Sequence, residues 1–445
     1  MSQEQNPLTH GPILPALLRF ALPLFLGNLF QQLYNAVDSL VVGNFCGNDA
    51  LAAVSSSGSL CHLLIGFFQG VFVGASVLIS RFYGAREPDK VDRAVHTTLL
   101  FSLVFGLVLT VLGIAFTPAL LRLMGTPANV LPNSITYFRI YCAGLLGLVL
   151  YNTTNGIFQA LGDSRHPLYY LIISSVVNVV LDLLFVGGMK MGVAGAALAT
   201  IIGQALSALL GLVHLCSGKF LIKVSLSHLK PDFPLLGRVL HLGLPSGVQN
   251  SVISIANLVV QSNINAFGDQ AMAGCGSYSK IEAFVFLPIT CMTLAMTTFT
   301  SQNLGAGKLD RVRQGAKTGL ILLPITAEVI GLAFFALAPF LVGLFSRDPD
   351  VIAFGARQAR IESLFYCCLA FSHGCAALLR GAGRAVTPMA VMLVCWCLFR
   401  ICYITAMVSH FQTITVVFTA YPVTWSLSSI LFAIALWKGD WLNHP

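Results

Sequence analysis

The sequence contains few charged residues. Lys, Arg, Asp and Glu together make up 9% of its 445 residues, whereas soluble globular proteins carry about 25%. Apolar residues account for 56% of the chain. This balance excludes a soluble globular protein and a disordered chain, since disorder requires high charge and low hydrophobicity. The 12 cysteines are too dilute for a disulfide-stapled secreted module. The chain is therefore interpreted as a polytopic membrane protein.

Motifs for enzymatic and metal chemistry are also missing. The sequence has no His-Glu-x-x-His signature, no Gly-rich phosphate loop with Lys and no Gly-x-Ser-x-Gly turn. Most cysteines lie in apolar runs, where they behave as small hydrophobic residues. Cys395 and Cys397 have no second Cys or His pair nearby to complete a metal site. We therefore expect no enzyme, no cofactor and no structural metal.

Long apolar runs predict the membrane-spanning helices, because a charge at the bilayer centre costs about 2.5 to 3.5 kcal/mol on insertion scales. Each predicted run contains at most one charged residue. The runs are 20–44, 50–80, 94–121, 140–162, 166–189, 191–218, 239–268, 283–307, 318–346, 363–379, 385–409 and 413–437. The sequence thus predicts an all-α membrane protein with twelve transmembrane helices.

Lys and Arg are distributed unevenly between the two sets of loops. If the N-terminus is cytoplasmic, 17 of the 25 Lys and Arg residues lie in the loops on that side, and the opposite loops contain Arg122, Arg139, Lys190, Lys280, Arg347, Arg357 and Arg360. Basic residues favour the cytoplasmic side during insertion, so we expect both termini in the cytoplasm. The net charge of +8 then reflects insertion and not nucleic-acid binding. The first eleven residues contain no Lys or Arg, and no cleaved targeting segment is expected.

The chain contains an internal repeat. Gly84-Ala85 recurs as Gly305-Ala306 at a shift of 221 residues, and Arg139-Ile140 recurs as Arg360-Ile361 at the same shift. Near the start, Leu22-Pro23 recurs as Leu244-Pro245 at a shift of 222. The ordered series predicts a duplication with six spans in each copy.

Because six is an even number, the two copies run in the same sense through the membrane. They are then related by a pseudo-two-fold axis along the membrane normal. We expect a six-helix bundle at 12–216, a cytoplasmic linker at 217–234 and a second six-helix bundle at 235–437. Such a pair of bundles is suited to transport by alternating access.

These motifs, taken in order, resemble the multidrug and toxic compound extrusion (MATE) family, and its DinF-like branch in particular. The resemblance rests on Pro23, Asn28 and Asp38 in the first span, on the two Gly-Ala loops, and on 159–163 (QALGD) after the fourth span. Members of the family are secondary antiporters that export cationic amphiphilic compounds in exchange for protons or sodium ions. The resemblance implies a bacterial-type transporter of the cell inner membrane.

Two acids in the first copy are the strongest candidates for a functional site, since a carboxylate inside a membrane is rare and costly. Asp38 precedes a predicted turn at Gly43-Asn44 by five residues, and Asp182 precedes Gly187-Gly188 by five. Both are expected roughly 8 Å below the ends of their helices. Held together, two carboxylates repel when both are ionised, so uptake of a proton is plausible. Oxygen ligands would equally suit Na+.

The resemblance implies a cation or proton site in the first half of the chain. Its expected members are Asp38, Tyr137, Asn155, Asn178, Asp182 and Thr200. Polar contacts between helices are the alternative reading, above all for Tyr137 and Thr200. The positions of the second copy that match Asp38, Asn178 and Asp182 are Val260, Phe399 and Tyr403. We therefore expect a site in the first half only.

Other residues receive weaker assignments. Pro23 removes a helical hydrogen bond and is a candidate hinge in the first span. Candidate residues of a substrate cavity are Tyr34, Tyr278, Glu282, Phe286 and Met292. Glu362 is expected to form an ion pair with Arg357 or Arg360, and Glu328 to have a structural role. Local pairing is an equally weighted alternative for Glu282.

The sequence predicts a monomeric secondary antiporter that exports cationic amphiphilic compounds in exchange for H+ or Na+. Its expected partners are these small molecules and the lipid bilayer. A lipid-linked oligosaccharide flippase of the same superfamily is the nearest alternative, although such proteins usually have more spans and a cationic cavity. A channel would need a continuous polar lining, and a membrane enzyme would need a nucleophile or metal motif.

Overall fold

The computed structural model describes residues 7–46, 48–123, 130–218, 222–225, 228–439 and 441–442, and it leaves the side chains of 39, 43–44, 46 and 48–64 undescribed. Throughout these residues the regular structure is helical. The helices of the first half are α1 (Ile13–Cys46), α2 (Asn48–Gly84), α3 (Pro88–Leu123), α4 (Leu131–Ala143), α5 (Leu145–Ala160), α6 (Arg165–Asp182), the π-helical turn η1 (Leu183–Gly188) and α7 (Val193–Cys216).

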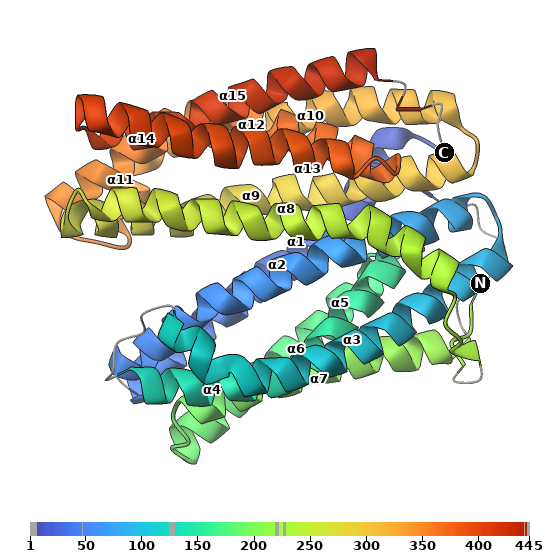
Figure 1. Cartoon of the computed structure of the whole chain (residues 1–445), viewed down its shortest axis with the longest axis horizontal. Coiled ribbons are helices and arrows are strands. Elements are labelled where there is room, and N and C mark those ends of the chain that lie inside the picture. The colour runs from blue at the N-terminus through green and yellow to red at the C-terminus, as the bar shows by residue number, and fades with distance from the viewer. Residues whose placement is uncertain are drawn as a thin grey trace. The chain divides into compact units, whose positions relative to one another are not determined.

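The second half repeats this pattern of long helices (Figure 1). It contains α8 (Phe233–Asn265), α9 (Asp269–Gly305), α10 (Leu309–Gly343), α11 (Pro349–Glu362), η3 (Ser363–Phe365), α12 (Tyr366–Gly381), α13 (Val386–Met392), η4 (Leu393–Phe399), α14 (Arg400–Phe411) and α15 (Ile414–Lys438).

The helices match the predicted membrane passes. Ten described helical segments are long and apolar enough to cross a membrane, and α4 with α5, bent by 49°, makes an eleventh. Helix α8 has 33 residues and completes the twelve predicted passes. One detail was wrong: α1 continues through residues 43 and 44 to Cys46, so Gly43-Asn44 does not form a turn. Without a proline there, the helical hydrogen bonds simply continue for another turn.

The chain folds into two compact units. Unit 1 comprises Leu22–Gly243, and unit 2 comprises Pro7–Ala21 and Leu244–Pro445. The divisions fall inside α1 and α8, directly ahead of Pro23 and Pro245, and not at the expected linker. Each proline removes a backbone hydrogen bond and allows its helix to change direction. Helices α1 and α8 therefore each contribute to both units.

In unit 1, α6 packs against α7, and α5 packs against α2, α3 and α7. An apolar cluster joins α2, α3 and α5 to Ile222 and Val224 of the linker and to Val239 of α8. The Ser225 backbone N–H also donates to Nε2 of the buried His96 at 3.1 Å. These contacts hold the described part of the linker against the start of α3.

In unit 2, α9 packs against α10, α11 and α12. The segment before α1 is fastened to the same helices. Asn303 Nδ2 donates to the Leu8 carbonyl oxygen at 3.1 Å, Lys308 Nζ to that of Thr9 at 2.8 Å and Arg311 Nη1 to that of Gly11 at 2.6 Å. Residues 8–11 are therefore an ordered part of unit 2.

Candidate functional site

Asp38 of α1 and Asp182 of α6 lie together inside unit 1. Asp38 is 9% exposed and Asp182 is fully buried. Their carboxyl groups are close enough to interact directly and to share a hydrogen bond when one of them carries a proton. Two helices that are distant in the sequence thus bring two acids into one low-dielectric site.

The polar atoms around this pair are not satisfied by the protein. Asp38 Oδ1, both carboxylate oxygens of Asp182 and both side-chain polar atoms of Asn178 are buried without a hydrogen-bond partner among the described residues. An unpaired buried polar group costs about 1 to 3 kcal/mol. Asn178 lies one helical turn before Asp182 and offers its amide oxygen at the same site. This donor set of oxygens fits a proton or a hard cation such as Na+.

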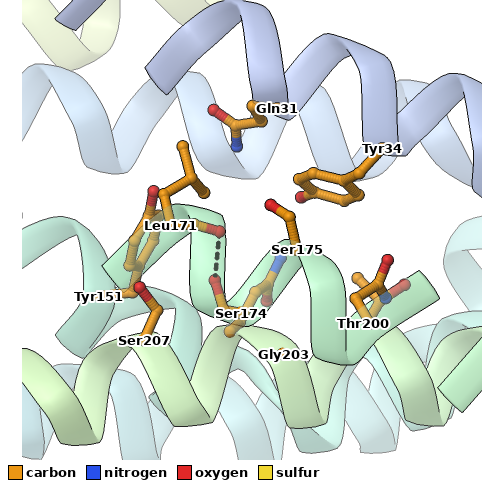
Figure 2. A pocket seen from close by; sticks show the side chains of 11 residues that line it. Gln31, Tyr34, Tyr151, Leu171, Ser174, Ser175, Thr200, Gly203 and Ser207 are labelled. Atoms are coloured by element: carbon orange, nitrogen blue, oxygen red, sulfur yellow. Dashed lines mark hydrogen bonds between the residues drawn. The ribbon is translucent and has the colours of Figure 1, made fainter. Parts of the chain in front are cut away.

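A small cavity lies between α1, α5, α6 and α7, and it shares Asn178 with the group around the two acids, which do not themselves line it. In Figure 2, Gln31 and Tyr34 project from α1 toward Ser175 of α6. Its volume is about 20 Å³, which suffices for one water molecule or a single small ion. Drug-sized ligands need about 300 to 1,000 Å³. The lining comprises Gln31, Tyr34, Tyr151, Leu171, Ser174, Ser175, Asn178, Thr200, Gly203, Gln204 and Ser207.

An apolar layer closes the other side of the pair. Val41 and Val42 lie one turn beyond Asp38 on α1, and Val186 lies one turn beyond Asp182. The three valines form a buried cluster with Tyr137, Val193, Ala196 and Ala197. The acids therefore have polar neighbours toward the cavity and apolar neighbours toward the helix ends.

The structure separates the remaining candidates into three groups. Thr200 lines the cavity and donates through Oγ1 to the Ala196 carbonyl oxygen at 3.0 Å. Asn155 interacts with Tyr151, whose side chain lines the cavity. Tyr137 belongs to the apolar layer. Asn178 adjoins the acids directly, whereas the other three reach the site at its margins.

Sequence reasoning missed most of the cavity. Gln31 and Ser175 lie two helical turns before Asp38 and Asp182, and Gln204 and Ser207 follow Thr200 by four and seven residues. These are the spacings of one helix face. Helical periodicity, applied outward from the predicted acids, would have found them.

A second group of buried polar residues lies in unit 2 around Tyr278, which is fully buried. The Tyr278 hydroxyl oxygen is 2.7 Å from that of Tyr366, 3.1 Å from Glu362 Oε2 and 3.3 Å from Glu282 Oε1. Gln358 Nε2 donates to Glu362 Oε1 at 2.8 Å. The second half therefore also brings two acids together, at positions other than those that match Asp38, Asn178 and Asp182, and a coupling site in the first half only stays a prediction.

The predicted ion pair of Glu362 with Arg357 or Arg360 was also wrong. Both arginines are exposed, while Glu362 is buried. They precede Glu362 by five and two residues, spacings that place side chains on different faces of a helix. Gln358, four residues before Glu362, occupies the facing position instead.

Arg400 supplies the positive charge of this group. It is buried and donates from Nη2 to Thr424 Oγ1 at 3.0 Å, and its guanidinium stacks on Tyr421 at 4.4 Å from the ring centre. It is attracted electrostatically to Glu282 and Glu362. A buried cation so placed compensates part of the charge of the two acids.

The last candidates have mixed surroundings. Glu328 accepts the backbone N–H of Cys367 at 3.0 Å, which agrees with a structural role. Met292 is buried in the core of unit 2, and Phe286 packs edge-on against His373. Tyr34 lines the small cavity of unit 1. Contact of Tyr34, Tyr278, Glu282, Phe286 and Met292 with a transported molecule stays a prediction.

Comparisons with known proteins match both halves of the chain. The MatE family model covers residues 23–184 and 245–405, and each match begins at or next to one of the two prolines where the units divide. The chain is 31% identical to "Probable multidrug resistance protein YoeA" of Bacillus subtilis (strain 168) over 446 residues, covering 97% of this chain and 96% of that protein.

Two further similarities extend this result. The "FAD transporter" of Shewanella oneidensis is 26% identical, with 79% of this chain and 78% of that protein covered. A solved structure described as an outward-facing multidrug resistance MATE family transporter superposes with a TM-score of 0.92 at 23% identity, covering 100% of this chain and 99% of the other. With its repeated six-helix halves and a full-length family match, the chain belongs to the MATE family of membrane transporters.

Proposed function

We propose that the protein is a secondary antiporter that exports cationic amphiphilic compounds in exchange for H+ or Na+, with Asp38 and Asp182 as the coupling site. The observation that carries the proposal is the set of unpaired buried oxygens on Asp38, Asn178 and Asp182. A bound proton or cation removes the free-energy cost of burying these oxygens without a partner, and its release restores that cost. Ion binding is thereby linked to the free energy of one conformation over another.

The size and polarity of the site support an ion rather than a drug as its ligand. The cavity of about 20 Å³ is lined by hydroxyl and amide groups and ends at an apolar layer. In this state the coupling ion binds from the cavity side, and Val41, Val42 and Val186 close the site on the other side. This is one half of an alternating-access cycle. Transport of the organic substrate is then driven by the ion gradient across the membrane.

The names of relatives support export as the activity and organic molecules as the substrates. YoeA is named a probable multidrug resistance protein, and MepA of Staphylococcus aureus, 22% identical over 86% of this chain, is named a multidrug export protein. We extend multidrug export to this chain on that basis. The Shewanella relative named an FAD transporter makes a flavin a useful second substrate for the assay.

We further propose that both termini lie in the cytoplasm of a bacterial cell. In unit 1 the start of α3, which carries Lys90 and Arg93, meets the basic linker through the 3.9 Å contact between Arg93 and Asp232 and the His96–Ser225 hydrogen bond. The Lys and Arg residues near them therefore gather at one end of the unit. The positive-inside rule assigns that end to the cytoplasm.

Export from proteoliposomes under separately imposed proton and sodium gradients tests the proposal. We expect one of the two gradients to drive movement of a fluorescent organic cation by the wild-type protein. Asp38→Asn and Asp182→Asn should each abolish gradient-driven movement, because an amide neither takes up a proton nor neutralises a cation. Asp310→Asn is the matched control, since Asp310 is an acid 89% exposed at the surface of unit 2.

Two results would contradict the proposal. Full gradient-driven export by both Asp38→Asn and Asp182→Asn would remove the coupling site. Scrambling of a lipid-linked oligosaccharide without any export of the fluorescent cation would instead identify a flippase.

A further inference from the structure

An open groove runs along unit 2 where α10 ends and α11 begins. Its volume is about 530 Å³, and most of its lining is apolar. The lining residues are Pro339, Pro349, Ile352, Ala353, Ala356, Arg357, Arg360 and Ile361. It lies apart from the buried polar group around Tyr278, whose side chains occupy the other face of α11. None of the functions proposed above uses this groove.

The two arginines carry the only charges in the groove lining. Arg357 and Arg360 lie on the exposed face of α11, and neither forms an ion pair with any acid in the described part of the chain. The Arg360 guanidinium lies over the Phe335 ring, 5.9 Å from its centre. Both side chains thus present donors that no carboxylate among the described residues satisfies.

The surface around the arginines has the character of a lipid contact. Phe340 of α10 is 64% exposed, and Leu344, the residue directly after α10, is 65% exposed. Leu337 and Leu364 are also exposed. Arg357 and Arg360 follow the start of α11 at Pro349 by about 12 and 16 Å at the helical rise. An unpaired cation at the bilayer centre costs about 2.5 to 3.5 kcal/mol on insertion scales, so a cation within the membrane favours a position where it reaches an anion. Long arginine side chains extend toward the interface to do so.

We propose that this groove binds an anionic phospholipid. The phosphate accepts hydrogen bonds from Arg357 and Arg360, and an acyl chain follows Ile352, Ile361 and Pro339. Planar guanidinium groups match phosphate oxygens in forked pairs of hydrogen bonds. The groove far exceeds a free phosphate ion in size and opens onto apolar surface, which favours a lipid as the source of the phosphate.

The internal repeat provides a built-in comparison. Arg360 corresponds to Arg139 of α4, which is also exposed, whereas Arg357 corresponds to Thr136. The second copy therefore has two arginines one turn apart where the first copy has one. Paired recognition of a phosphate is possible only in unit 2, so Arg139→Gln is a matched control for loss of a single exposed arginine.

Native mass spectrometry of the full-length chain in detergent tests the site. Dioleoylphosphatidylglycerol, dioleoylphosphatidylcholine and inorganic phosphate are titrated separately. We expect phosphatidylglycerol to bind at least about tenfold more tightly than phosphatidylcholine, and Arg357→Gln with Arg360→Gln to weaken it by about tenfold or more. Arg139→Gln should leave this affinity unchanged.

Three outcomes would overturn the proposal. The first is equal affinity for phosphatidylglycerol and phosphatidylcholine, and the second is an unchanged preference for phosphatidylglycerol in the double variant. The third is an affinity for inorganic phosphate as high as that for phosphatidylglycerol. Melting temperatures of the variants in detergent show that any lost binding does not come from unfolding. Because both arginines are exposed, we expect those temperatures to match the wild type. The result is independent of whether Asp38 and Asp182 couple transport.

Discussion

Gly74 of α2 and Gly243 of α8 cross with their backbones in contact. A Cβ atom on Gly74 would lie 2.3 Å from the Gly243 nitrogen, and one on Gly243 would lie 2.3 Å from the Val71 carbonyl oxygen. Neither residue thus tolerates a side chain without movement of a backbone. The crossing fastens the first part of α8 to unit 1 directly before Pro245, so bending of α8 is confined to the residues that follow.

Gly74→Val should destabilise the protein by about 1 to 3 kcal/mol, the usual cost of forcing extra volume into a packed contact. The measurement is the thermal unfolding midpoint of the detergent-solubilised protein. Gly237→Ala on α8, the other helix of the crossing, is the control, because a Cβ there would have no neighbour within 4 Å. Equal stability of Gly74→Val and Gly237→Ala would show that the crossing is not as close as described.

Polar substitution in the apolar layer should create an ion leak. Val186 is 2% exposed and separates the acids from the helix ends. Val186→Thr keeps the volume but adds a hydroxyl group that can carry water or a proton. We expect ion flux without substrate to rise several-fold in proteoliposomes. Val180→Thr, at a position 57% exposed on the preceding helix, should leave the flux at the wild-type level.

Loss of the α1 proline should slow transport without preventing ion binding. Pro23→Ala restores a backbone hydrogen bond and stiffens α1 at the division between units. We expect a roughly tenfold lower turnover with an unchanged binding affinity for the coupling ion, measured separately in proteoliposomes and by titration. Pro118→Ala, inside α3 and away from the division, serves as the comparison. Equal turnover in Pro23→Ala and the wild type would exclude a hinge at Pro23.

Removal of the buried arginine should destabilise unit 2 strongly. Arg400→Gln removes the buried positive charge that attracts Glu282 and Glu362, and we expect a loss of about 1 to 3 kcal/mol, the usual cost of leaving buried polar groups uncompensated. The double variant Glu362→Gln with Arg400→Gln should recover part of that loss. Thermal unfolding of both variants, with exposed Arg347→Gln as the control, measures the effect. Additive losses would show that the two charges do not interact.

The membrane passes, the repeat and the two acids of unit 1 could be predicted because each depends on local pattern. Apolar run length determines where a helix crosses a bilayer, and a lone acid in such a run stands out. Asn178 and Thr200 came from the family resemblance, and the structure places both beside the acids or their cavity.

The sequence could not reveal features that depend on packing between distant helices. Tyr278, Glu362 and Arg400 lie on three different helices, so the residues next to each of them in the sequence do not indicate that the three form one cluster. Glu362 was instead assigned to the nearest basic residues in the sequence, although their spacing placed them on another face. The division of α1 and α8 between units likewise depends on which helices they contact.

The exchange of α1 and α8 between units also constrains how the polypeptide acquires its structure during synthesis. Residues 7–21 are synthesised before unit 1, yet their companions in unit 2 are synthesised after it. Unit 1 in turn remains unfinished until the start of α8 has been made. A gene divided within the linker would therefore encode two fragments, each bearing a segment that belongs with the other, and co-expression would be required for either to mature.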